Sequence, residues 1–250
     1  MRRIPAMAAL TAGGAYGALQ MLGRRAGSTA RERQARLPGD ELVPEPQMVT
    51  NHATTIAARP QEIWPYLSQM GWHLGGYYTP HWVDERLFPE NWTSLDRLDP
   101  NLLRDLKAGD IIPDGKPGTA HYVVVRADAP SLLLLKSDTH LPPGWGDKYG
   151  AEFTWTWCFN LTDLGDASTR VHLRVRGHSD PWWLTALYVG ALIPADYVMS
   201  TGMLRGLKSR AELGAPPEAS GREALRQELY TKPPGPALIA GPSAAAGTRT

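Results

Sequence analysis

The stretch from residue 53 to residue 76 constrains the fold most, because it reads as a strand that runs directly into a helix. β-Branched residues make up most of 53–57, and Pro60 follows at a position where proline favours a first helical turn. Apolar residues then recur at helical spacing as far as Gly71, a residue type that commonly ends helices. A short amphipathic helix of this kind must pack on another element.

Two β-hairpins are predicted further along the chain, where short runs rich in β-branched and aromatic residues are separated by turn residues. The first pairs 121–126 with 131–136, and the second pairs 152–161 with 169–176 around Gly165. Because the strands cluster between residues 108 and 178 and are joined by short turns, the pattern predicts an antiparallel sheet. It argues against a parallel sheet with helices on both faces.

The second hairpin has one apolar face. Its first strand places four aromatic residues on alternate positions, and its second strand alternates valine and leucine with His172, Arg174 and Arg176. We therefore expect the aromatic face to point inward and His172 and Arg174 to lie on the outer face. The aromatic residues are Phe153, Trp155, Trp157 and Phe159.

An uncharged run at residues 4–23 has about the length that a bilayer crossing requires. It predicts a helical membrane anchor over residues 1–25, with a cleaved signal peptide or a flexible leader as the alternatives. Arginines follow the run, where a signal peptide would continue into neutral sequence. By the positive-inside rule they favour a membrane-associated protein with its domain in the cytoplasm. These arginines are Arg24, Arg25, Arg31, Arg33 and Arg36.

Three further segments complete the organisation. Residues 26–47 are polar and contain proline, which predicts a linker, and the Pro/Ala/Gly-rich tail 215–250 is predicted to be disordered. Residues 181–195 form a second uncharged run that is too short for a confident span, so we expect a buried or interfacial helix. From Asp196 a long amphipathic helix is expected to pack on the sheet.

Composition excludes some classes of function. The 26 basic and 25 acidic residues give a net charge of +1, so no overall electrostatic attraction to nucleic acid is expected. Cys158 is the only cysteine, which rules out an intrachain disulfide and a cysteine-based zinc site. His81, Asp84 and Glu85 could in principle supply metal ligands, but we interpret Asp84 and Glu85 as an exposed helix face. We therefore predict no metal and no cofactor.

At three places the sequence resembles one known superfamily. The strand followed by A-x-P-x-x-I-W-x-x-L-x-Q-M-G, over residues 58–71, looks like the opening of the SRPBCC or START-like superfamily, which includes polyketide cyclase/dehydrase and lipid-transport relatives. Residues 37–44 resemble the lead-in of a bacterial membrane-associated branch, and residues 199–212 resemble its terminal helix. Together the resemblance covers roughly residues 37–213.

This resemblance implies an α+β helix-grip fold over residues 48–214, in which a curved antiparallel sheet wraps around a long C-terminal helix. It also implies an apolar pocket between sheet and helix, although the same large side chains could instead fill that space. The implied wall consists of Trp64, Trp82, Phe153, Trp155, Trp157, Leu173 and Met203.

Two functions compete for such a pocket. A cyclase or dehydratase needs a positioned acid/base group and donors for an enolate oxygen, whereas a carrier needs shape and one anchoring contact. We expect too few titratable groups to converge, so no catalytic residue is predicted. Non-catalytic binding of a hydrophobic small molecule or lipid is favoured, with a polyketide cyclase/dehydratase-like enzyme as the alternative. The titratable candidates are His81, His121, Lys136, His172 and Arg174.

Overall fold

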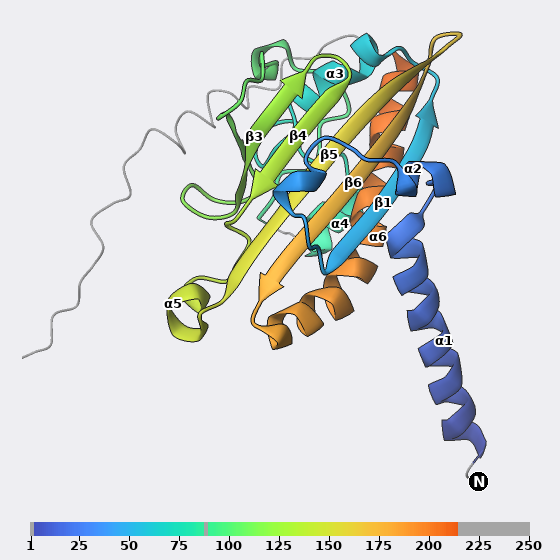
Figure 1. Cartoon of the computed structure of the whole chain (residues 1–250). Helices are drawn as coiled ribbons and strands as arrows, with labels where there is room; N and C mark the ends of the chain where they lie inside the picture. Colours follow the sequence, from blue (N-terminus) through green and yellow to red (C-terminus); the bar gives the residue numbers. More distant parts are fainter. Residues whose placement is uncertain (1–2, 88–89, 215–250) are drawn as a thin grey trace, which may run out of the picture.

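The computed structural model describes residues 3–87 and 90–214 and shows a six-stranded sheet with a long helix across one face (Figure 1). The predicted disordered tail at 215–250 lies outside the described residues. In chain order the elements are α1 (Arg3–Arg25), α2 (Ala30–Gln34), β1 (Met48–Ile56), α3 (Pro60–Ser68), α4 (His81–Leu87), β2 (Ile111–Pro113), β3 (His121–Asp128), β4 (Leu132–Ser137), α5 (Trp145–Tyr149), β5 (Glu152–Gly165), β6 (Ser168–Asp180) and α6 (Trp182–Leu213).

The sheet has the strand order β1-β6-β5-β4-β3-β2, and each neighbouring pair is antiparallel. Both predicted hairpins are confirmed, as β3–β4 and β5–β6. The strand and helix predicted for residues 53–71 are β1 and α3, with Pro60 in the first turn of α3. The sheet curves around α6 (Figure 1), which confirms the α+β helix-grip fold.

The aromatic residues of β5 lie on the inner face, as predicted. Along the strand the ring centroids of Trp155 lie 5.2 Å from those of Phe153 and 6.1 Å from those of Trp157. Phe159 pairs with Leu173 of β6, and both side chains are fully buried. Period-two alternation therefore places the apolar side of both strands against α6, where the main core forms.

The two segments that we expected before and after Asp196 form one continuous helix, α6. Its second half is held by the sheet, with Met203, Leu204 and Leu207 buried. Gly206 lies so close to the backbone carbonyl of Tyr78 that a side chain could not fit there. Much of the first half remains on the surface, contrary to a buried helix.

Pro194 inside α6 creates an attachment point for α1. Proline has no backbone N–H, so the carbonyl of Gly190, one turn earlier, loses its helical partner. The hydroxyl of Tyr16 in α1 donates to this carbonyl at 2.8 Å, and Gln20 Nε2 donates to the carbonyl of Val189 at 2.9 Å. The C-terminal half of α1 is thereby fixed against α6.

Membrane insertion of α1 stays a prediction. Among the described residues, α6 is the helix whose length and mean hydropathy reach those of a membrane-spanning segment, and 28% of its apolar window is buried inside the protein. Because the second half of α6 packs in the core, we do not interpret α6 as a transmembrane helix. α1, which also lies within the described residues, does not reach these values.

Residues 26–47, expected to be a linker, form an ordered segment across the outer face of the sheet; we call it the strap. Arg174 of β6 reaches into it, donating to the carbonyl of Glu32 at 2.7 Å and to the Asp40 carboxylate at 2.8 Å. Arg170 pairs with Glu32 at 2.7 Å, and Arg176 donates to the carbonyl of Val43 at 2.8 Å. Alternate arginines of one strand therefore hold the strap.

The strap changes the environment of the outer-face residues. His172 and Arg174 lie on the outer face as predicted, yet both are buried beneath the strap. Burial, followed by the charge of Arg174, lowers the pKa of His172 to about 4, so this imidazole is neutral at physiological pH. Beneath the strap, the side-chain oxygen of Asn51 accepts a hydrogen bond from His172 Nε2 and one from Arg174 Nε, at 3.0 Å each.

Replacing Arg174 with alanine should destabilise the protein strongly. The change removes the guanidinium that donates to Asp40 and to three strap carbonyls, and removing one member of a buried pair costs about 3 kcal/mol or more. Urea unfolding followed by circular dichroism measures the loss. Arg126→Ala is the matched control, because Arg126 forms an exposed pair with Asp128 and should leave the midpoint nearly unchanged. Equal midpoints for the two variants would show that the strap contributes nothing.

Candidate functional site

A cavity of about 340 Å³ lies between the inner face of the sheet and α6. One wall is aromatic and comes from the sheet and the preceding loop, with Tyr77, Tyr122, Trp155 and Trp157. The opposite wall is the middle of α6, where Leu192, Met199 and Met203 line the space. The volume lies within the range of small-molecule sites, and its lining is largely apolar.

The seven residues predicted to form the wall separate into three groups. Trp155, Trp157 and Met203 line the cavity. Leu173 is buried in the core, and Phe153 packs beside Trp155 and against Tyr188. Trp64 is partly buried against the core, whereas Trp82 is 52% exposed, and neither lines the cavity.

The reason for the exposure of Trp82 is the burial of Asp84. We interpreted Asp84 as part of an exposed helix face, but its carboxylate accepts from the hydroxyl of Thr79 at 2.6 Å and from the backbone N–H of Ser94 at 3.2 Å. These bonds turn Asp84 and Val83 inward and leave Trp82 outside. Asp84 instead belongs to the cavity lining.

Three hydrogen-bond donors of the aromatic wall have no partner within the described part of the chain. They are the hydroxyl of Tyr122 and the indole N–H groups of Trp155 and Trp157, and all three polar atoms are buried. Burial raises the pKa of Tyr122 well above its usual value, and the nearby Asp114 raises it further. The Tyr122 hydroxyl therefore stays protonated and available as a donor. Unpaired buried donors are rare in proteins, because each costs about 1–3 kcal/mol.

A histidine and an aspartate meet at the edge of this wall. His140 Nε2 and Asp114 Oδ2 lie 2.8 Å apart, and His140 Nδ1 lies 2.7 Å from the hydroxyl of Ser137. The imidazole ring is 4.9 Å from the rings of Tyr122 and Trp155. This pair was not predicted from the sequence, because the two residues are in different loops and share no local motif.

A second pair lies on the helix side of the cavity. His52 Nε2 of β1 and Asp196 Oδ2 of α6 lie 2.7 Å apart, and the hydroxyl of Ser200 donates to the other Asp196 oxygen at 2.6 Å. His52 is completely buried, so this contact joins the edge strand to α6 behind the cavity lining. It too was missed, since 144 residues separate the two partners.

None of the five titratable residues that we considered from the sequence lines the cavity. Those on the outer face are held by the strap, and Lys136 pairs with Asp138 at the surface. The titratable side chains that do line it include Asp84, Asp114, His140 and Asp196, and no lysine or arginine occurs among the lining residues that the structure describes. Within residues 3–87 and 90–214, no group of three or more His, Cys, Asp or Glu side chains is placed to hold a metal ion.

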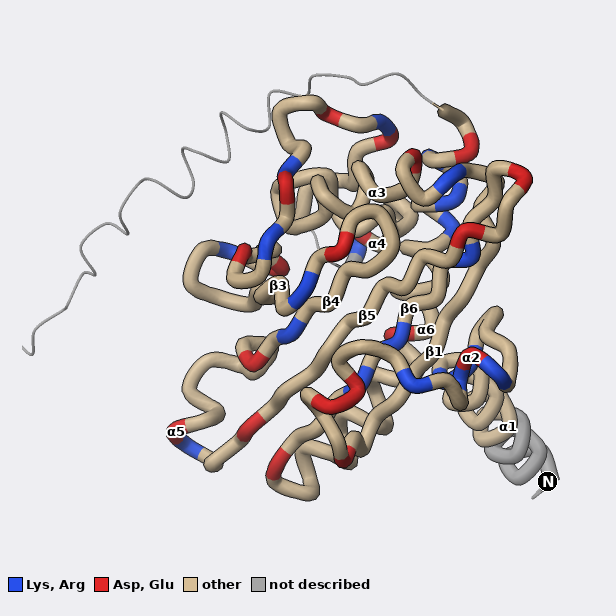
Figure 2. The backbone as a smooth tube through the Cα atoms, turned by 45° about the horizontal axis from the view of Figure 1, so that its top comes forward, with Lys and Arg blue, Asp and Glu red and all other residues tan. Residues whose placement is uncertain are grey.

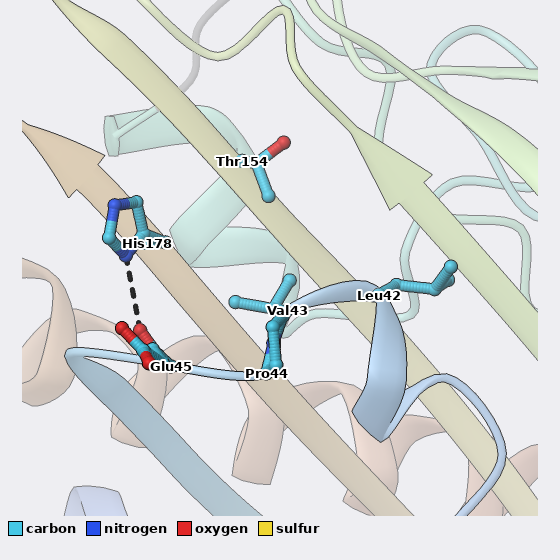
Figure 3. A pocket seen from close by; sticks show the side chains of 6 residues that line it. All are labelled: Leu42, Val43, Pro44, Glu45, Thr154 and His178. Atoms are coloured by element: carbon cyan, nitrogen blue, oxygen red, sulfur yellow. Dashed lines mark hydrogen bonds between the residues drawn. The ribbon is translucent and has the colours of Figure 1, made fainter.

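A separate shallow depression lies on the outer face, where the strap crosses β5 and β6 (Figure 3). His178 Nδ1 lies 3.1 Å from the carbonyl of Glu45, and this contact and Asp180 raise the pKa of His178. Leu42, Val43, Pro44 and Thr154 form the rest of the lining. The inner cavity combines apolar walls with unpaired donors, and this depression does not, so the inner cavity is the candidate site.

No protein-family model matches the sequence, and no curated protein does. Among solved structures, the chain is similar to hypothetical protein jhp0584 from Helicobacter pylori, with 12% identity over 70% of this chain and 95% of that chain and a TM-score of 0.42. It is also similar to CalU16 from Micromonospora echinospora (16% identity, 66% and 84% coverage, TM-score 0.30). Norcoclaurine synthase from Thalictrum flavum gives 18% identity, 63% and 86% coverage and a TM-score of 0.33. At these values the similarities assign no function.

Replacing Tyr122 with phenylalanine should preserve or raise the stability of the ligand-free protein. The hydroxyl has no partner among the described residues, so its removal relieves a desolvation cost of about 1–3 kcal/mol while the ring remains in the core. Thermal unfolding of the protein after removal of any copurified small molecule provides the measurement. Tyr66→Phe is the control, because the Tyr66 hydroxyl donates to the carbonyl of Arg210 and its loss should be destabilising. A clear loss of stability for Tyr122→Phe would contradict the prediction.

Proposed function

We propose that the protein binds a neutral hydrophobic small molecule or lipid through a hydrogen-bond acceptor, without changing it chemically. The observation that carries this proposal is the set of unpaired donors on the aromatic wall, at Tyr122, Trp155 and Trp157. An indole N–H can only donate, so the complementary group on the ligand is an acceptor such as a carbonyl or ether oxygen. The surrounding apolar wall accommodates the remainder of the ligand.

The charge of the lining argues for a neutral acceptor. A carboxylate or phosphate moved from water into an apolar cavity needs a cationic partner. Among the described residues, the lining contains Asp84, Asp114 and Asp196 and no lysine or arginine. Repulsion from these side chains therefore disfavours fatty-acid carboxylates and charged lipid headgroups within the cavity, whereas a ketone, an ester or a neutral lipid meets no such opposition.

We also propose that α1 anchors the protein to a membrane with the domain on the cytoplasmic side. The uncharged run of residues 4–23 supports this, together with Arg24 and Arg25 at the end of α1 nearest the domain. The helix extends away from the sheet (Figure 1). A hydrophobic ligand that partitions into the bilayer would thus be concentrated beside the cavity.

A matched pair of ligands tests the binding proposal. Isothermal titration of the full chain with 2-acetylnaphthalene, a neutral ketone, and with 2-naphthoate, its anionic counterpart, should show binding of the ketone at least about tenfold tighter. Trp157→Phe removes one donor and keeps an aromatic ring, so ketone affinity should fall about fivefold, the equivalent of one hydrogen bond of about 1 kcal/mol. Trp64→Phe, outside the cavity, is the control and should leave affinity unchanged. Tighter binding of the carboxylate would refute the proposal.

The Asp114–His140 pair beside Tyr122 favours one alternative, an enzyme of the cyclase or dehydratase kind. Asp114 is placed to act as a general base with His140 holding its orientation, and the Tyr122 hydroxyl can donate to an enolate oxygen. This alternative predicts that the protein cyclises a soluble poly-β-ketone and that Asp114→Asn lowers kcat at least about a hundredfold with little change in ketone affinity. Product analysis by mass spectrometry decides it. Equal turnover by Asp114→Asn and the parent would exclude Asp114 as the base.

A further inference from the structure

The first half of α6 exposes a large apolar surface. Trp182 is 79% exposed and Leu187 is 49% exposed, although side chains of this size are usually covered. No charged residue occurs between Trp182 and Pro194. The sheet does not cover this part of α6, because the helix turns near Pro194 and its first half runs along the lower edge of the domain (Figure 1).

The neighbouring α1 continues this surface. Tyr16, Leu19 and Leu22 are exposed on the part of α1 that is bound to α6 at Gly190. Gly23 allows α1 to approach the backbone of Ile193 closely. α1 and the first half of α6 lie at the same end of the domain (Figure 1).

An aromatic group stands at the other end of the same edge. Trp183 of α6 lies with its ring 5.7 Å from that of Trp145 and 5.8 Å from that of Tyr149, both in α5. Tryptophan and tyrosine are enriched where a protein meets the boundary between lipid and water, because each ring has an apolar body and a polar tip. The edge thus combines aliphatic, aromatic and uncharged side chains.

We propose that this edge, which we call the docking edge and define as residues 182–193 of α6 together with Trp145 and Tyr149, rests in the surface of a lipid bilayer. The first half of α6 then lies along the headgroup region while α1 points into the membrane. A bilayer covers both the projecting α1 and the docking edge at once, whereas a second protein copy seated on α6 leaves the projecting part of α1 exposed. This inference rests on the proposed anchoring by α1, adds a second membrane contact to it, and does not depend on a ligand in the cavity.

Charge identifies the kind of lipid contact. Figure 2 shows both signs of charge near α5, with Asp147 and Lys148 in this short helix and Glu152 and Asp180 at the nearby strand ends. Such an edge has no excess of basic residues with which to attract anionic lipid. Insertion of apolar side chains therefore drives docking, and neutral phosphatidylcholine is a sufficient partner.

Site-specific labelling tests the docking edge in the full chain. The single native cysteine, Cys158, is only 3% exposed, so a cysteine introduced at an exposed site can be labelled selectively with the fluorophore NBD. The two test variants are Leu187→Cys and Trp182→Cys. Leu164→Cys is the matched control, because Leu164 is 53% exposed at the tip of the β5–β6 hairpin, at the opposite end of the domain. Each protein is reconstituted into phosphatidylcholine vesicles with or without nitroxide-labelled phosphatidylcholine.

Nitroxide lipid should quench the labels at residues 182 and 187 at least about threefold more than the label at residue 164. Quenching no greater than at residue 164, for both test positions, would overturn the proposal. Shielding that disappears on dilution of the protein in the vesicles and is insensitive to nitroxide would identify a second copy as the occupant and also overturn it. Two test positions are used, so that if one variant fails to fold the other still decides the result. The readout needs no ligand, and the titrations with 2-acetylnaphthalene need no membrane, so the docking edge and ligand binding fail independently. Flotation of the labelled proteins with the vesicles reports the anchor itself. Proteins that float with the vesicles but are quenched at residues 182 and 187 no more than at residue 164 overturn the docking edge alone, whereas loss of flotation overturns the anchor.

Discussion

The guanidinium group of Arg174 is the contact on which the outer half of the structure depends. It lies beneath the strap and donates to Asn51, to Asp40 and to three strap carbonyls. A buried arginine with fewer partners would cost the fold several kcal/mol, so the strap and the strand require each other. The strap therefore covers the outer face around β6 while α6 covers the inner face, whereas Ile111 and Val123 at the β2–β3 side remain exposed.

Local patterns were sufficient to predict the sheet and the helix that it holds. The alternation around Trp155 fixed the inner face of β5, and the glycine and proline turns located the hairpins. The strap could not be predicted in this way. Its polar, proline-containing sequence is the same whether it is solvated or folded, and only pairing with Arg174, more than 130 residues away, distinguishes the two.

The candidate site was predicted less well than the fold for the same reason. Periodicity places Trp155, Trp157 and Met203 on core-facing positions, and only the resemblance implied that they wall a pocket, where the structure has them. Asp114 and His140 come together only after β3 and β4 have paired, so neither carries a local signal. Trp82 was expected to face inward because it is an apolar residue on a short helix. Hydrogen bonds to Asp84 instead direct the Asp84 side of that helix toward the core, and Trp82 lies on the exposed side.

Pro194 also connects α1 to the cavity wall through α6. The carbonyl that this proline leaves free is bound by Tyr16 of α1, and Leu192 and Asp196, within about one and a half turns of it, line the cavity. A tilt of α1 therefore reaches the cavity wall through little more than one turn of a stiff helix, with no flexible loop between them to absorb the movement. Under the proposed anchoring of α1, the thickness or curvature of the membrane would set that tilt and so adjust the width of the cavity.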